Sequence, residues 1–388
     1  MYSETSIETM KKIIISIFTF LITAGLLRAE ENLSTLIAAA EGGDAEAQAK
    51  LAVCYGRGDG VEQDYKKAFE WAMKAAEQGN ADGQYTVAGC YIQGKGVEQN
   101  IQRTIYWLEK AAKQGHEESL VTLGNIYIKG VGIPCNYEKA RFWFERGVEL
   151  GYASAMLNLG SMYRFGRGVP QDIKKTLALY EQAAQKGNSL AQYGLGSIYL
   201  FGEGVPINYK EAEVWLELAA EQDDEDAIIA LGAMYMNGWG VSQDHIKAKE
   251  LLERAVVLGN MVAQYNLANI YMERKGVPVD TEKAKSLYEK SSSQGYASAS
   301  CNLGTMYLQG IGVPVDYQRA RLYYERAIAQ GNKDTAMYNL GLMNLRGLGM
   351  PKDLKKAREW FDEVEAAGNV VPEEFKVELE AAENEAAR

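Results

Sequence analysis

The chain has few of the residues that usually carry metal or nucleophilic chemistry. Among its 388 residues there are two histidines and four cysteines. It contains no H-E-x-x-H zinc pair, no P-loop and no S-x-x-K nucleophile motif. Both histidines, His116 and His245, stand beside turns, where we expect solvated surface side chains. The sequence therefore predicts a protein that is not an enzyme, with no cofactor and no bound metal.

Positive charge is also scarce. The chain has 41 Lys and Arg against 52 Asp and Glu, a net charge of −11. A protein without a basic patch is a poor partner for nucleic acid and for anionic membrane surfaces. The acidic run from Asp223 to Asp226 could suggest calcium, but it lacks the alternating ligand pattern of a calcium loop. A solvated helix start is the better interpretation.

Four cysteines are too few for a disulfide in every part of a chain this long. Cys54 and Cys90 are 36 residues apart, at equivalent places in the pattern described below. Stacked helices lie about 8–10 Å apart, which exceeds the Cα separation that a disulfide usually allows. We therefore expect buried free thiols rather than a disulfide. Cys135 is expected in a loop and Cys301 on a helix surface.

The N-terminus differs from the rest of the chain. Lys11 and Lys12 precede an apolar run of 15 residues, IIISIFTFLITAGLL, which Arg28 and Ala29 follow. This order is typical of a secretory signal peptide, and the run is short for a bilayer span. We expect residues 1–29 to be removed after Ala29, which would place the protein in the periplasm or outside the cell without stable membrane insertion. The alternative is an uncleaved anchor.

What the sequence has in abundance is repetition. A glycine recurs every 36 residues, with Asp223 filling one gap, and the ninth repeat is one residue longer. In most repeats a Leu or Val follows the opening glycine after eight residues, then a small residue, then a Tyr. The opening glycines are Gly43, Gly79, Gly115, Gly151, Gly187, Gly259, Gly295 and Gly331.

Each recurring residue has a structural role. Leu and Tyr four residues apart lie on one helix face, and the small residue between them lets a second helix approach. The opening glycine suits a left-handed turn, and Asp or Asn before the second helix is an N-cap. Each repeat is thus a helix-turn-helix whose apolar face only its neighbours can bury. We expect a capping half-repeat at residues 30–42 and a polar capping helix at 368–388.

The repeat also carries a family resemblance. The pattern A-x-x-x-L-G-x-x-Y-x-x-G-x-G-V-x-x-D-x-x-K-A-x-x-W-x-x-x-A-A-x-x-G resembles the Sel-1-like repeat, a relative of the tetratricopeptide repeat, over nine repeats at residues 43–367. The resemblance implies an all-α fold, a right-handed α-solenoid superhelix, of the secreted or periplasmic bacterial type. Arg274, Ser291–Ser292 and Asn344 depart from the pattern, and we expect weaker packing there. Some cysteine-rich members are linked to penicillin binding, but their two cysteines per repeat are absent here.

The resemblance also indicates a binding surface. In tetratricopeptide-like stacks the first helices line a concave face, so residues six, seven and ten places after the opening glycine should meet a partner. Tyr offers contact area, and Asn offers both a donor and an acceptor. The alternative is that these residues pack or bond between neighbouring repeats. We call this set the A-helix row: Tyr85, Asn125, Asn158, Tyr193, Tyr265, Asn266, Asn269, Asn302, Tyr338 and Asn339.

These observations predict a non-catalytic scaffold or adaptor of the bacterial cell envelope. It would bind a protein or an extended peptide on its concave face. One alternative is an exported factor that interacts with proteins of a host or neighbouring cell. Another is a cell-wall-acting enzyme, such as a penicillin-binding or β-lactamase-like relative.

Overall fold

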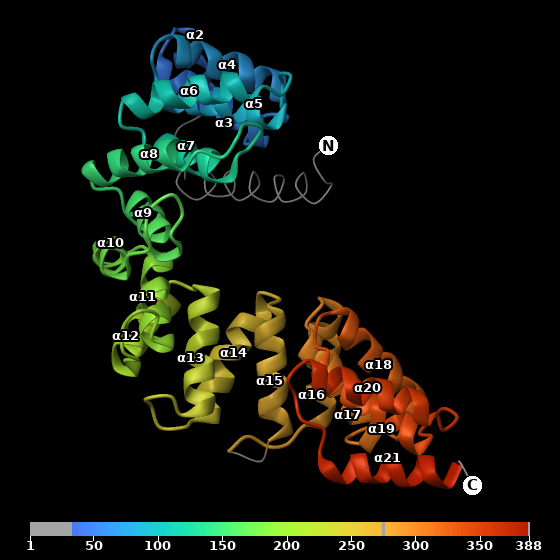
Figure 1. The fold of residues 1–388 in the computed structure, drawn as a ribbon. Coiled ribbons are helices and arrows are strands. Elements are labelled where there is room, and N and C mark those ends of the chain that lie inside the picture. The colour runs from blue at the N-terminus through green and yellow to red at the C-terminus, as the bar shows by residue number, and fades with distance from the viewer. Residues whose placement is uncertain (1–32, 274–275, 387–388) are drawn as a thin grey trace. The chain divides into compact units, whose positions relative to one another are not determined.

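The computed structural model describes residues 33–273 and 276–386 of the chain (Figure 1). These residues form 20 α-helices and no strand, so the predicted all-α fold is confirmed. The expected signal peptide over residues 1–29, with its cleavage site, lies outside the described residues. None of the described helices is long and apolar enough to cross a membrane.

The chain divides into two compact units, and the boundary between Gln192 and Tyr193 falls inside helix α11 (Ser189–Phe201). We call them the N-terminal and the C-terminal unit. Within each, consecutive helices pack as hairpins of a first helix A and a second helix B. The N-terminal unit contains α2 (Leu33–Glu41), α3 (Ala45–Arg57), α4 (Tyr65–Glu77), α5 (Ala81–Gln93), α6 (Ile101–Lys113), α7 (Glu117–Lys129), α8 (Tyr137–Glu149), α9 (Ala153–Phe165) and α10 (Ile173–Gln185). The C-terminal unit contains α12 (Tyr209–Glu221), α13 (Glu225–Asn237), α14 (His245–Val257), α15 (Met261–Met272), α16 (Thr281–Ser293), α17 (Ala297–Gln309), α18 (Tyr317–Ala329), α19 (Asp334–Arg346), α20 (Leu354–Ala366) and α21 (Glu373–Ala386).

Helices begin and end where the sequence predicts. The Asp64 side chain accepts hydrogen bonds from the backbone N–H groups of Lys66 and Lys67 at the start of α4. Equivalent caps start the other B helices, and each satisfies a backbone donor that the helix itself leaves unpaired. A helices mostly end at a glycine in the left-handed conformation, as α3 does at Gly58 (φ +81°). The remaining B-helix caps are Asn100, Asn136, Asp172, Asn208, Asp244, Asp280, Asp316 and Asp353.

The turn that opens each repeat also has the predicted conformation. Gly43 and Gly79 have φ of +96° and +90°. Among the described residues Asp223 is the one non-glycine with positive φ, at 59°. Arg254 donates a hydrogen bond of 2.7 Å to its carboxylate. The next residue, Asp224, caps α13, so the acidic run is a helix start as expected.

The small residue in the middle of helix A allows the two helices of a repeat to touch. A Cβ added at Gly160 would lie 2.7 Å from the Tyr180 ring, and one at Gly304 would lie 2.7 Å from the Tyr324 ring. Real Cβ atoms do not come this close to a ring, so the helices approach to a distance that a larger residue would forbid. The same contact joins Gly124 to Phe144, Gly196 to Leu216, Gly232 to Leu252 and Gly341 to Phe361.

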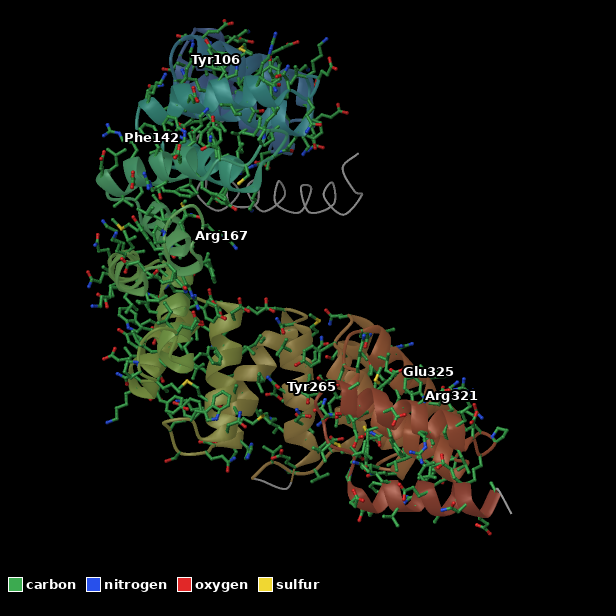
Figure 2. The ribbon with its side chains drawn as sticks, in the orientation of Figure 1. Tyr106, Phe142, Arg167, Tyr265, Arg321 and Glu325 are labelled. Carbon is green, nitrogen blue, oxygen red and sulfur yellow. The ribbon has the colours of Figure 1, made fainter. Side chains whose placement is uncertain are left out.

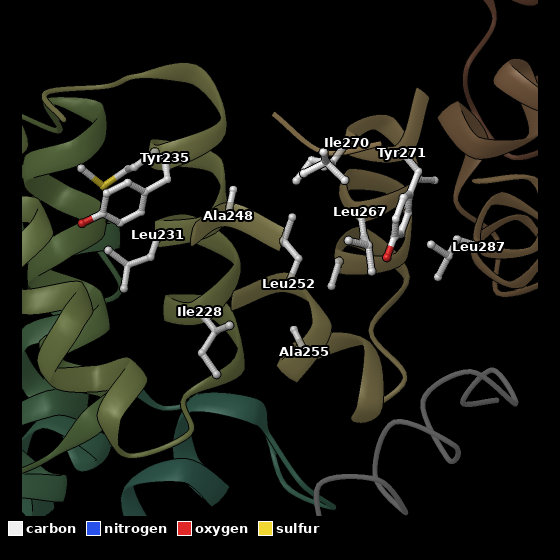
Figure 3. Packing of buried hydrophobic residues seen from close by; sticks show 14 of the residues in the cluster. Ile228, Leu231, Tyr235, Ala248, Leu252, Ala255, Leu267, Ile270, Tyr271 and Leu287 are labelled. Atoms are coloured by element: carbon white, nitrogen blue, oxygen red, sulfur yellow. The ribbon is translucent and has the colours of Figure 1, made fainter. Parts of the chain in front are cut away.

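The hydrophobic core runs from repeat to repeat. Figure 3 shows Leu231 of α13, Leu252 of α14 and Leu267 of α15 in one buried cluster of the C-terminal unit. Each of these side chains is at most 3% exposed. Helices of about 13 residues are marginal alone in water. Packing between repeats therefore supplies most of their stability.

Glutamine pairs tie the ends of the helices together inside individual repeats. Gln78, after α4, donates a hydrogen bond of 2.7 Å to Gln48 of α3. Gln48 in turn donates to the carbonyl of Ala40 in the preceding helix. Gln48 is 4% exposed, so these bonds satisfy amide groups that would otherwise be buried without partners. The pairs Gln114–Gln84 and Gln294–Gln264 repeat the arrangement.

The recurring Tyr of helix A lies under a cation from helix B. In the C-terminal unit, the Lys247 ammonium is 4.0 Å from the centre of the Tyr235 ring. Such contacts between a cation and a ring face are favourable by about 0.5–1 kcal/mol at exposed sites. The other pairs are Lys67–Tyr55, Arg103–Tyr91, Lys139–Tyr127, Lys175–Tyr163, Lys283–Tyr271 and Arg319–Tyr307.

A helix outside the repeats packs at each end. At the N-terminal end, α2 buries Leu36 against α3. At the C-terminal end, α21 buries Leu379 and packs on α20. Two pairs, which we call the arginine clamps, hold α21 from outside the core: Arg346–Glu378 and Arg358–Glu383.

Two expectations about individual residues are wrong. Ser291 and Ser292 do not weaken the packing of α16, since both are at most 1% exposed and their hydroxyls bond to Met261 O and Ser300 Oγ. Cys301 does not lie on a surface but is 4% exposed, because its place on α17 faces the core formed with Tyr324. Burial raises the pKa of the Cys301 thiol to about 11. Cys54 and Cys90 are buried free thiols and Cys135 is an exposed one, as expected.

Candidate functional site

The A-helix row is divided between the two units. Tyr85 of α5, Asn125 of α7 and Asn158 of α9 belong to the N-terminal unit, and the other seven residues belong to the C-terminal unit. Each unit therefore has to be considered by its own side chains. Within the row the structure separates residues that are already bonded from residues that are open to a partner.

One polar network joins three helices of the C-terminal unit. The Tyr288 hydroxyl of α16 donates to Asn269 Oδ1 of α15 at 2.5 Å. Asn302 Nδ2 of α17 donates to the Tyr288 hydroxyl (3.0 Å) and to Asn269 Oδ1 (3.3 Å). Asn269 and Asn302 thus bond between neighbouring repeats, which was the alternative to a partner-binding role. Burial raises the pKa of Tyr288, so its hydroxyl keeps its proton and remains a donor.

The ring of Tyr265 lies beside this network, next to the ring of Tyr288. Its ring centre is 5.9 Å from that of Tyr288 and 4.9 Å from that of Tyr296. Burial also raises the pKa of Tyr296. In this cluster of three rings Tyr288 is buried, while Tyr265 and Tyr296 are half-buried. Tyr265 is the member that belongs to the A-helix row.

Two asparagines of the row bond to their own helices. Asn158 Nδ2 donates to the carbonyl of Ser154 at 2.7 Å. Asn339 Nδ2 donates to the carbonyl of Thr335 at 2.8 Å. In both cases the partner is four residues earlier, so one amide proton is occupied and the side-chain oxygen stays available.

Asn125 and Asn266 are different. Both side chains are half-buried. Within residues 33–273 and 276–386, neither amide has a hydrogen-bond partner. Each therefore offers two donors and an acceptor in a partly dehydrated place, where a partner's backbone could satisfy them.

The tyrosines of the row are not equally accessible. Tyr85 is 7% exposed, and burial raises its pKa to about 12. Its ring lies 5.1 Å from that of His116, so it packs inside the N-terminal unit and does not face a partner. Tyr193 and Tyr338 are half-buried. The Tyr338 ring contacts Phe375 of α21 at 5.8 Å between centres.

The prediction of solvated histidines is wrong for both. His116 is the N-cap of α7, with its side chain 12% exposed. Its Nδ1 accepts a hydrogen bond from the backbone of Ser119, and its Nε2 is 3.1 Å from Asp82. That bond lowers the pKa of Asp82. His245, the first residue of α14, is 7% exposed and packed rather than solvated.

The described residues contain no group of three or more His, Cys, Asp or Glu side chains that could hold a metal ion. The side chains of the row are amides and phenols. Such groups recognise a ligand by hydrogen bonds and contact area rather than by nucleophilic chemistry.

Sequence reasoning missed Tyr288, which decides whether Asn269 is free. A regular spacing could have revealed it, because the tenth residue of a repeat bonds to a Tyr 19 residues later. Ser161 bonds to Tyr180 in this way at 2.8 Å, and Thr305 bonds to Tyr324 at 3.1 Å. Where position 29 of the repeat carries no hydroxyl, as at Phe144, the asparagine opposite stays unpaired.

Comparison with known proteins agrees with this architecture. The Sel1 repeat family matches nine times, at residues 45–80, 81–116, 118–152, 153–188, 189–224, 225–260, 262–296, 297–332 and 334–363. No curated protein matches the chain.

Two of the solved structures that are similar to this chain are themselves proteins with this repeat fold. One is a protective antigen present in uropathogenic Escherichia coli strains that displays an SLR fold. It is 33% identical with a TM-score of 0.71, over 86% of this chain and 71% of that one. The other is a Sel1 repeat protein from Oxalobacter formigenes, 32% identical with a TM-score of 0.59, over 84% of this chain and 93% of that one. Proteins built from this repeat generally act as protein-interaction scaffolds. The chain is an all-α solenoid that belongs to the Sel1 repeat family.

Proposed function

We propose that this protein is a non-catalytic scaffold that binds a protein partner through the open part of its A-helix row. The observation that carries the proposal is the pair of unpaired, half-buried amides at Asn125 and Asn266. The basic-apolar N-terminal sequence supports a location in the periplasm or outside the cell.

The energetics favour an extended peptide as the bound element. An amide that is partly removed from water and unpaired has lost hydration without gaining a partner, which costs about 1–3 kcal/mol when burial is complete. The backbone of an extended peptide presents both N–H and C=O groups, which match the two donors and one acceptor of each amide. A bound peptide therefore relieves this cost, whereas Asn269 and Asn302 are already satisfied and gain less.

The experiment compares two double variants of the full chain. Asn125→Ala with Asn266→Ala removes the unpaired amides, and Asn158→Ala with Asn339→Ala removes amides that bond to their own helices. Tagged proteins are incubated with cell-envelope extract, recovered proteins are quantified by mass spectrometry, and the enriched partner is then purified for direct titration. We expect each lost amide to weaken binding at its own unit by about two- to twelvefold, since one hydrogen bond is worth about 0.5–1.5 kcal/mol.

Circular dichroism of both variants checks that the helices are retained. Equal recovery and equal affinity of the partner with wild type and with the first variant would contradict the proposal. A larger loss in the second variant would contradict it as well, because that result would place the contact at the amides that bond to their own helices.

A further inference from the structure

The last repeat lacks one side chain that the other eight repeats have. Asn344 of α19 stands where they place the recurring Tyr. It is 5% exposed, and its Nδ2 donates to the carbonyl of Leu340, four residues earlier on the same helix. The short side chain therefore bonds to its own helix. It does not fill the space that the phenol ring occupies in the other repeats.

Two earlier repeats of the C-terminal unit, the sixth and the eighth, show what surrounds that ring when it is present. The Tyr235 hydroxyl donates to Glu213 Oε1 (2.6 Å) and accepts from Lys247 Nζ (2.6 Å). The Tyr307 ring stacks on Tyr323, with centres 5.7 Å apart and an angle of 6° between planes. The phenol thus contacts a carboxylate and a cation at Tyr235, and an aromatic ring and the Arg319 cation at Tyr307.

The last repeat retains the cation and the aromatic ring, but Arg321 stands in the place of the Glu213 carboxylate. Lys356 corresponds in sequence to Arg319, the cation over Tyr307, and Trp360 corresponds to Tyr323. Arg321 and Glu325 of the preceding helix α18, both labelled in Figure 2, occupy the places that Glu213 and Glu217 have near Tyr235.

These residues line a cavity of about 440 Å³ that opens to solvent. Its wall is made of Arg321, Glu325, Leu340, Asn344, Met350, Pro351, Lys352, Asp353, Leu354, Lys356 and Trp360. We call it the α19 pocket. No residue of the A-helix row lines it, so binding in this pocket is independent of the proposed function.

We propose that the α19 pocket binds a tyrosine side chain presented by a protein partner. The guest ring stacks on Trp360, as Tyr307 stacks on Tyr323. Its hydroxyl accepts from the Lys356 ammonium, as Tyr235 does from Lys247. It donates to Glu325 Oε2, because Oε1 already accepts a hydrogen bond of 2.7 Å from Arg321. Tyrosine is favoured over phenylalanine, because a phenylalanine ring forms no hydrogen bond with the Lys356 ammonium or with Glu325 Oε2.

The test uses the full-length protein and two short peptides, N-acetyl-Gly-Tyr-Gly-amide and N-acetyl-Gly-Phe-Gly-amide. Binding is followed by the chemical shift of the Trp360 indole N–H in NMR titrations, with Trp360→Phe identifying that signal. We expect saturable binding of the tyrosine peptide at millimolar concentration, about tenfold tighter than the phenylalanine peptide. No binding, or equal binding of the two peptides, overturns the proposal.

Variants at the pocket provide the control. Asn344→Tyr restores the missing ring and should abolish peptide binding while raising the melting temperature, and Asn344→Leu should fill the pocket partly and weaken binding. Tyr307→Asn opens the matching place one repeat earlier and should add a second binding site. Unchanged affinity in Asn344→Tyr and Asn344→Leu overturns the proposal. Binding that remains single-site in a folded Tyr307→Asn protein overturns it too, because the surrounding residues would then not be sufficient.

Discussion

Substitution of one turn glycine should show how tightly consecutive repeats are joined. Gly96, between α5 and α6, has φ +72°, and a Cβ added there would lie 2.0 Å from the carbonyl oxygen of Tyr65, the first residue of α4. Gly79 has a similar φ of +90°, but a Cβ there meets nothing within 4 Å. Gly96→Ala and Gly79→Ala therefore share the backbone strain and differ in the contact between repeats.

The magnitudes follow from these two terms. Left-handed backbone costs an alanine about 1–2 kcal/mol, and this applies to both variants. The reduced freedom of the unfolded chain offsets about 0.4–1 kcal/mol, again in both. Only Gly96→Ala must also move a backbone carbonyl, and displacements of packed backbone cost about 1–3 kcal/mol. We expect Gly96→Ala to be less stable than Gly79→Ala by about 1–3 kcal/mol.

Urea unfolding of the full chain, followed by far-UV circular dichroism, measures the difference. Hydrogen exchange of α4 and of the turn before α6 locates it, because the weakened contact joins that turn to the first residue of α4. Equal unfolding midpoints and equal exchange for the two variants would refute the reasoning, since the contact with Tyr65 would then contribute nothing beyond the strain of the turn.

Three further outcomes are expected. Tyr288→Phe should lower the free energy of unfolding by about 1–2 kcal/mol, because Asn269 loses a hydrogen bond. Urea denaturation measures this free energy, which the control Tyr106→Phe, at an exposed position, should leave unchanged. In the folded protein at pH 8, a thiol reagent should label Cys135 alone, because the other three thiols are buried; labelling of four thiols without unfolding would contradict their burial. The arginine clamps lower the pKa of Glu378 and Glu383, so their contribution to the docking of α21 is complete above the usual carboxyl range and is lost as the pH falls through the lowered values. Hydrogen exchange at neutral and at acidic pH should therefore show that α21 is released before α20. Simultaneous release of α21 and α20 would argue against the clamps.

The sequence was sufficient to predict features that depend on a single residue type recurring at the same place in each repeat. The caps at Asp64 and its equivalents, the left-handed glycines and even Asp223 follow from local backbone requirements. The close approach of helices at Gly304 follows from the small residue between Leu303 and Tyr307. Each of these is decided within a few residues and then repeated.

The candidate site could be predicted only in part, because the state of each asparagine depends on a residue from another helix. Asn125 and Asn269 have the same place in their repeats, yet Asn269 is bonded because Tyr288 stands opposite, and Asn125 is unpaired because Phe144 does. The sequence showed the asparagines but not which of them were already engaged.

His245 illustrates the same limit. It stands beside a turn in the sequence, which suggested a solvated position. In other repeats, however, the first residue of helix B is covered by the turn of the following repeat, as Gly240 covers Tyr209 and Gly349 covers Tyr317. The equivalents of His245 are mostly aromatic or aliphatic, and that comparison would have indicated partial burial.

In several repeats the first residue of helix B is covered by a glycine from the turn of the next repeat, and this contact has an evolutionary consequence. Gly132 lies against Ile101 and Gly168 against Tyr137, in both cases 31 residues back along the chain. Recombination that removes or duplicates one complete period restores this register at the new junction, whereas a gain of one residue inside a helix would destroy it. The extra residue of the ninth repeat accordingly lies before α19, and there the helix follows Lys333 without a side-chain cap. The gene can therefore change the number of repeats, and so the extent of the surface offered to partners, without any new interface having to be invented.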